Sequence, residues 1–171
     1  VAEGSGRAST RHRLMDSYFA RILAGRHAGH RLAVVERGID AAARGEASWA
    51  ETTPEAHDLV SLGLLVNDRG RVRFRHALLR DYAAVVAIGE HSVEEICESL
   101  ARVRSSLIRA DFLRALIEAR IDAGDAVGIE RFVAACHRHE LAPWVGVSLI
   151  EIPPAALIEH CRERLAPWQV P

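Results

Sequence analysis

Apolar residues recur along this chain with a helical period, and their spacing predicts a mostly α-helical protein. From residue 10, the apolar positions 14, 18, 19, 22 and 23 fall on one face of a helix. Similar stripes predict helices over residues 30–44, 76–89, 106–123, 125–140, 142–150 and 154–165. Residues 52–55, Thr-Thr-Pro-Glu, begin a short helix that stops at Gly63. Ser92 with Glu95 predicts a capping box at another helix start.

Residues 64–75 depart from the helical period and predict a β-hairpin. Two short apolar runs flank the turn residues Asn-Asp-Arg-Gly at 67–70. The second run alternates, with arginines at 71, 73 and 75 on one face and Val72 and Phe74 on the other. Trp49, further upstream, is expected in a loop. Three helices followed by a hairpin is the layout of a winged-helix domain.

We therefore expect a mainly α fold: a winged-helix domain with a short β-hairpin, followed by a helical-repeat-like α bundle. Residues 1–27 form a linker and connecting helix, residues 28–91 the winged helix, and residues 92–171 a helical region of the HEAT or armadillo type. Short loops between helices of similar size favour such a repeat array.

Composition narrows the function. The chain has 171 residues, a net charge of -1, and 22 basic residues that are all arginine. A Schiff-base or P-loop lysine is therefore excluded within these residues, and no G-x-x-x-x-G-K-[ST] motif occurs. We expect no enzymatic activity from this chain by itself and no cofactor bound to it alone. The longest apolar run, residues 141–150, is too short to cross a bilayer, so no membrane is expected. Three widely spaced cysteines predict a reduced, cytoplasmic compartment.

Two clusters offer candidate chemistry. Cys136 and His139 are three residues apart on a helix face, and with His160 and Cys161 they could complete a tetrahedral zinc site. The alternative is that Cys136 continues an apolar core stripe, which is the interpretation we favour, and no metal site is predicted. Cys97 is likewise expected to be a buried small hydrophobe.

The second cluster is basic. Arg69, Arg71, Arg73 and Arg75 line the hairpin and could contact DNA phosphates as a wing does, or form a solvated or ion-paired face. The helix that would enter the major groove, residues 54–62, carries three side chains that give little base readout: Glu55, His57 and Asp58. Duplex DNA is therefore not the expected partner.

Residues 62–84 bear a family motif. Leu62-Gly-Leu-Leu-Val66 precedes the hairpin, and the sequence continues with Phe74, His76, Leu79, Asp81, Tyr82 and Ala84. This pattern resembles the winged-helix segment of NACHT and related STAND NTPases. Residues 7–18 of this chain also resemble the segment that joins the NTPase core to the winged helix in bacterial members of the family. The resemblance covers about residues 7–90. Phe74, Leu79 and Tyr82 are expected in the core, and Asp81 beside Arg80 or Arg75, or facing water.

The resemblance implies a regulatory role. In this family the winged helix folds back over bound ADP, and the histidine of the motif contacts the nucleotide phosphate and helps to hold the inactive state. That role falls by position on His76. The implied partners are an upstream NTPase domain of the same chain, which would bind ADP or ATP, and other protein subunits on activation. The alternative for His76 is a helix-start residue that bonds to the backbone and contacts no ligand.

Two other functions stay open. One is a winged-helix DNA-binding transcriptional regulator that uses the arginines of the hairpin. The other is a helical protein-interaction scaffold, for which Trp144, Ile150 and Trp168 are the candidate exposed apolar residues.

Overall fold

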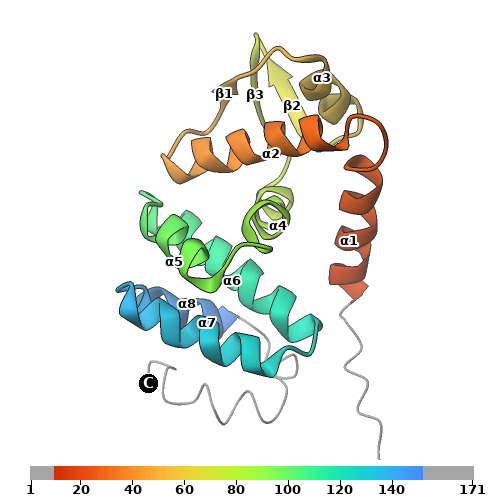
Figure 1. Ribbon diagram of the computed structural model, residues 1–171. Helices are drawn as coiled ribbons and strands as arrows, with labels where there is room; N and C mark the ends of the chain where they lie inside the picture. The colour runs from red at the N-terminus through yellow and green to blue at the C-terminus, as the bar shows by residue number, and fades with distance from the viewer. Residues whose placement is uncertain (1–9, 152–171) are drawn as a thin grey trace, which may run out of the picture.

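The computed structural model describes residues 10–151, which form a mainly α fold with one small sheet (Figure 1). The helices are α1 (Thr10–Ile22), α2 (Ala28–Ala43), α3 (Pro54–Ser61), α4 (Ala77–Ile88), α5 (Val93–Ala101), α6 (Ser106–Asp122), α7 (Ala126–Arg138) and α8 (Ala142–Glu151). The prediction of a mainly α fold that contains a short hairpin is confirmed. The helix expected over residues 154–165 lies outside the described residues.

The sheet has three antiparallel strands in the order β1-β3-β2. Strands β2 (Leu65–Asp68) and β3 (Arg71–Phe74) form the predicted hairpin, and β1 (Trp49–Ala50) pairs with β3. The expected loop at Trp49 is therefore wrong, because Trp49 lies opposite Val72 in the sheet. A strand of two residues is too short to show alternation in the sequence, and its pairing is long-range. Val72 is buried and Arg71 and Arg73 are exposed, as the alternation predicted.

The hairpin turn is tighter than the four residues expected, because Asn67 and Asp68 belong to β2. Only Arg69 and Gly70 remain in the turn, with φ of 52° and 81°. Two successive positive φ angles characterise the two-residue hairpin turns whose twist matches that of the strands. The Asn67 side chain accepts a 3.1 Å hydrogen bond from the backbone N–H of Gly70, which closes the turn.

Side chains cap the N-termini of several of the helices. The Thr53 hydroxyl accepts from the backbone N–H of Ala56, and Pro54 follows it at the first helical position of α3. The predicted capping box is confirmed: the Glu95 carboxylate accepts from the Ser92 N–H at 2.9 Å, and the Ser92 hydroxyl accepts from the Glu95 N–H. Such caps satisfy backbone donors that have no partner inside the helix.

One apolar core joins the sheet-bearing part to the later helices. Helix α6 packs against α4 on one side and against α8 on another, so that α5–α8 stack beneath the sheet-bearing region in Figure 1. Helix α1 stands beside α4, and the Tyr82 hydroxyl of α4 donates a hydrogen bond to Asp16 of α1. Helix α4 therefore contacts both an earlier helix, α1, and a later one, α6. Within residues 10–151, each helix is too short or too polar to cross a membrane.

Candidate functional site

His76 lies at the junction between the sheet and helix α4. It is the N-cap residue, with extended backbone at φ -139° and ψ 149°, and its side chain makes no capping hydrogen bond. Its carbonyl oxygen instead accepts from the backbone N–H groups of Leu79 and Arg80. The imidazole is exposed and has no hydrogen-bond partner among residues 10–151. The backbone of His76 thus starts the helix, while its side chain forms no hydrogen bond with the described residues and is available to a ligand.

A cavity of about 370 Å³ opens beside His76. Its walls come from α2, the segment before β1, the end of β3, the start of α4, and α6. The lining residues are Gly38, Ala42, Gly45, Glu46, Ala47, Trp49, Arg73, Phe74, His76, Ala77, Arg80 and Ile108. Small side chains on α2 leave the space, aromatic rings form one wall, and three basic side chains lie around it. This size and mixture are typical of a small-molecule site.

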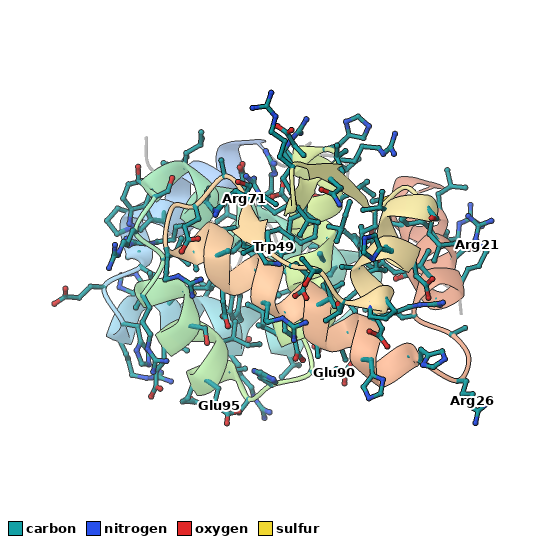
Figure 2. All side chains as sticks on the ribbon, turned by 90° about the horizontal axis from the view of Figure 1, so that it is seen from above. Arg21, Arg26, Trp49, Arg71, Glu90 and Glu95 are labelled. Atoms are coloured by element: carbon teal, nitrogen blue, oxygen red, sulfur yellow. The ribbon has the colours of Figure 1, made fainter. Side chains whose placement is uncertain are left out.

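The aromatic wall depends on a glycine. The Trp49 and Phe74 rings pack with centroids 5.5 Å apart. A Cβ at Gly38, in the middle of α2, would lie 2.6 Å from the Trp49 ring. Gly38 therefore permits the close approach of the indole to the helix. The Trp49 Nε1 is buried without a hydrogen-bond partner in the described part of the chain. Figure 2 shows Trp49 and its neighbour Arg71 at the sheet, beside α2.

The charged side chains around the cavity differ in whether they are already paired with another side chain. The Glu46 carboxylate bonds to Arg44 at 2.8 Å, and this bond is the main cause that lowers the Glu46 pKa. Arg80 is held by two carboxylates on its other side. Arg73 is exposed and forms no hydrogen bond or ion pair with another described residue. His76 and Arg73 are consequently the two basic side chains of the lining that an anion in the cavity could recruit without breaking an existing pair.

Arg80 belongs to a half-buried group of four charges that joins α4 to α6, which we name the Arg80 cluster: Arg80, Asp81, Asp111 and Arg114. The Arg80 Nε and Nη2 lie 2.8 and 2.6 Å from Asp81 Oδ1, and the same Nη2 lies 2.7 Å from Asp111 Oδ2. Arg114 Nη2 contacts Asp111 at 3.3 Å. Burial raises the pKa of the Asp81 carboxyl, and the neighbouring Arg80 offsets part of that rise. Of the alternatives for Asp81, the structure selects Arg80 rather than Arg75.

The arginines of the hairpin do not form a single row. Arg69 lies in the turn, and the Arg71 guanidinium is bound to Ser48, with Nε 2.9 Å from the hydroxyl oxygen. Arg73 lines the cavity, and Arg75 lies after β3, its Nε 4.0 Å from the Cβ position of Gly63. All four are exposed.

Helix α3, which would enter a DNA groove, keeps its carboxylates in contacts with α2 and the residues before it. Asp58 accepts a 2.8 Å bond from Arg31, and Glu55 lies beside His27 and His30. The division of the arginines and this acidic helix add no support for DNA binding.

The cysteines face each other in the core. Cys97 on α5 and Cys136 on α7 are fully buried, with their sulfur atoms 3.8 Å apart. Contact with Cys97, together with burial, holds the pKa of the Cys136 thiol above its ordinary value. The interpretation of Cys97 and Cys136 as core residues is confirmed. His139 is half-buried at the end of α7, and residues 160 and 161 lie outside the described residues.

The candidate patch for a protein scaffold is covered in part. Trp144 is half-buried against the core, and the Arg109 guanidinium lies 5.6 Å from the centre of its ring. The Ile150 side chain and Trp168 lie outside what the structure describes. Phe74, Leu79 and Tyr82 pack in or against the core, as expected.

The cavity was not anticipated from the sequence, and of the Arg80 cluster only the pair of Asp81 with Arg80 was, as one of three alternatives. Their residues come from five separate segments, and a local pattern can show only one segment at a time. The available signal was an aspartate in the apolar stripe of residues 78–86, which pointed to a buried charge that needs a partner. Comparison with protein-family models, with curated proteins and with solved structures finds no match for this chain.

Proposed function

We propose that this chain is the regulatory winged-helix region of a STAND-type signalling ATPase, and that it senses the bound nucleotide and holds the inactive state. The NTPase domain would lie upstream in the same polypeptide and bind ADP or ATP. His76 would donate a hydrogen bond to a phosphate of ADP. This chain would supply no catalytic group, and the parent protein would be a cytoplasmic ATPase whose activation recruits other protein subunits.

The observation that carries the proposal is the uncommitted His76 side chain at the start of α4. The N-terminus of a 12-residue helix presents free backbone N–H groups and a positive field, both of which favour a phosphate. The adjacent Arg73 is exposed and adds a positive charge. The 370 Å³ cavity between them and Trp49 has the dimensions of a ligand site.

The packing of α4 supports a route from nucleotide to output. The Tyr82 hydroxyl bonds to Asp16 of α1, which would lead back to the NTPase domain. The Arg80 cluster holds the other face of α4 to α6. A phosphate that binds at His76 therefore acts on a helix fastened to both neighbours. When ATP replaces ADP and this contact is lost, a rigid-body rotation of α4 with its neighbours would expose an oligomerising surface.

The test is a matched pair of histidine variants in the full-length protein. His76→Ala removes the phosphate donor at the start of α4. His91→Ala removes another exposed histidine just after the end of the same helix. We expect H76A to release ADP about tenfold faster, which corresponds to about 1.4 kcal/mol, and to raise basal signalling. H91A should retain the ADP affinity of the parent protein.

Equal ADP release from H76A, H91A and the parent protein would remove His76 from the site. The wider proposal depends on the upstream sequence, which should encode G-x-x-x-x-G-K-[ST]. A native polypeptide without that motif would overturn the proposal as a whole. Residues 1–171 alone should bind ADP weakly or not at all, because the phosphate loop is missing from them.

A further inference from the structure

Three metal-binding side chains converge where helices α2 and α3 begin. His27 is the residue before α2, His30 lies in its first turn, and Glu55 lies in the first turn of α3. One donor atom from each lies within 4.8 Å of the others. Glu55 Oε1 is 3.5 Å from His30 Nδ1 and 3.9 Å from His27 Nδ1. This group is separate from the cavity at His76.

We propose that His27, His30 and Glu55 form a binding site for one divalent transition-metal ion, with Zn²⁺ the favoured occupant. Two imidazole nitrogens and one carboxylate oxygen suit zinc and its neighbours, whereas Mg²⁺ and Ca²⁺ prefer oxygen ligands alone. Zinc with bonds of about 2.0–2.1 Å would hold tetrahedral ligands about 3.3 Å apart. The separations of Glu55 Oε1 from the two imidazole nitrogens, 3.5 and 3.9 Å, are near that value, and each pair of donor atoms lies within 4.8 Å.

The backbone positions these groups before any metal arrives. His27 and His30 are three residues apart, so they share one face of the helix end. His27 is the N-cap residue of α2, and its side chain makes no capping hydrogen bond. Arg31 fixes the distance between the helices: it bonds to Asp58 of α3 at 2.8 Å and to the Ile22 carbonyl oxygen at 3.1 Å. The site thus lies on two helices that the Arg31–Asp58 ion pair holds together.

Access and open coordination follow from exposure. The His27 and His30 side chains keep 53% and 76% of their surface, whereas Glu55 keeps 19%. The Arg26 side chain next to them points outward at the edge of the molecule in Figure 2. Glu55 is therefore the inner ligand of the site, and the two histidines lie nearer the solvent. Three protein ligands leave a fourth tetrahedral position for water.

The experiment is a calorimetric titration of the 171-residue chain with ZnCl₂. A parallel titration with Co²⁺ is monitored by absorption, which reports tetrahedral coordination. Its variants are His30→Ala, Glu55→Gln and the control His57→Ala, which removes an exposed histidine from the same helix as Glu55. We expect H30A and E55Q to weaken the tetrahedral site by about tenfold or more, because even outer-shell losses cost about 10–100-fold. H57A should bind like the unmodified chain, and MgCl₂ should give no signal.

A second measurement separates the site from the thiols and the remaining histidines. Because the metal would join α2 to α3, Zn²⁺ should raise the thermal midpoint of the unmodified chain and of H57A, but not of H30A. Zinc affinity that is unchanged in H30A and E55Q would assign the ion to other donors and overturn the proposal. Absence of any zinc binding would overturn it as well. Neither result bears on the role proposed for His76, which requires no metal.

Discussion

The guanidinium of Arg80 on α4 lies 2.7 Å from the carboxylate of Asp111 on α6, although 31 residues separate them in the chain. The same guanidinium group also binds Asp81, which keeps only 7% of its side-chain surface. Together with Arg114, which lies 3.3 Å from Asp111, Arg80 compensates two carboxylates at the contact between the sheet-bearing region and the helices that follow. This arrangement makes the joint between the two regions sensitive to single charge changes.

Arg80→Met should destabilise the protein by about 3 kcal/mol, because it removes one of the two cations of a half-buried charged group and leaves Asp81 and Asp111 with Arg114 alone. We place the effect at the lower end of the usual range because Asp111 keeps 19% of its surface. Urea unfolding measures the change. Arg102→Met is the control: its pair with Glu98 is exposed, and its loss should cost less than about 0.5 kcal/mol. Equal losses in the two variants would show that Arg80 is no more important than a surface arginine.

The raised pKa of Asp81 makes a second prediction, on pH. Burial is the main cause of the rise, so the folded protein holds the Asp81 proton more tightly than the unfolded chain does. The resulting contribution to the free energy of unfolding is fully present below the ordinary carboxyl pKa of about 3.9, and it is lost as pH rises through the folded value. Asp81→Asn has no such proton to lose. Measured from about pH 4 to about pH 7, the difference in stability should shift toward D81N as pH rises. Parallel pH profiles would contradict the assignment.

Gly38→Ala tests the aromatic wall of the cavity. Alanine favours a helix over glycine by about 1 kcal/mol, but its Cβ would lie 2.6 Å from Trp49 and 3.0 Å from Phe74. Overpacking of this kind costs about 1–3 kcal/mol, so the net change should be destabilising. The same helix offers a control. Gly29→Ala meets nothing within 4 Å, and it should stabilise the protein by up to about 1 kcal/mol. Thermal unfolding of the two variants should therefore shift in opposite directions.

Features that depend on neighbouring residues could be predicted from the sequence, and contacts between distant segments could not. The capping box at Ser92, the hairpin and the start of α4 next to His76 each depend on residues close together in the chain. The strand at Trp49 exists only because β3 is available to pair with it. Asp81 had two candidate partners in the sequence. Arg75 ends near Gly63, while Arg80 extends along α4 toward α6, and this choice depends on where α6 packs.

The same limit applies to the candidate site. His76 was identified by a motif within one segment, whereas its cavity requires α2, β1 and α6 to meet beside it. The convergence of His27, His30 and Glu55 likewise depends on how α2 and α3 cross. Their spacing in the chain, three residues and then 25, is not a recognisable metal-binding pattern.

The hairpin turn supports a final prediction. Arg69 adopts a φ of 52°, which a side chain other than glycine, asparagine or aspartate adopts at a cost of about 1–2 kcal/mol. Asn followed by Gly is the preferred pair for this turn, and Gly70 is already in place. Arg69→Asn should therefore raise the free energy of unfolding by about 1 kcal/mol. Arg69→Ala removes the same positive charge but keeps the strained backbone, so it should give no such gain. If both variants were stabilised equally in urea unfolding, the gain would come from relief of repulsion among the arginines of the hairpin, and the turn geometry would not be its cause.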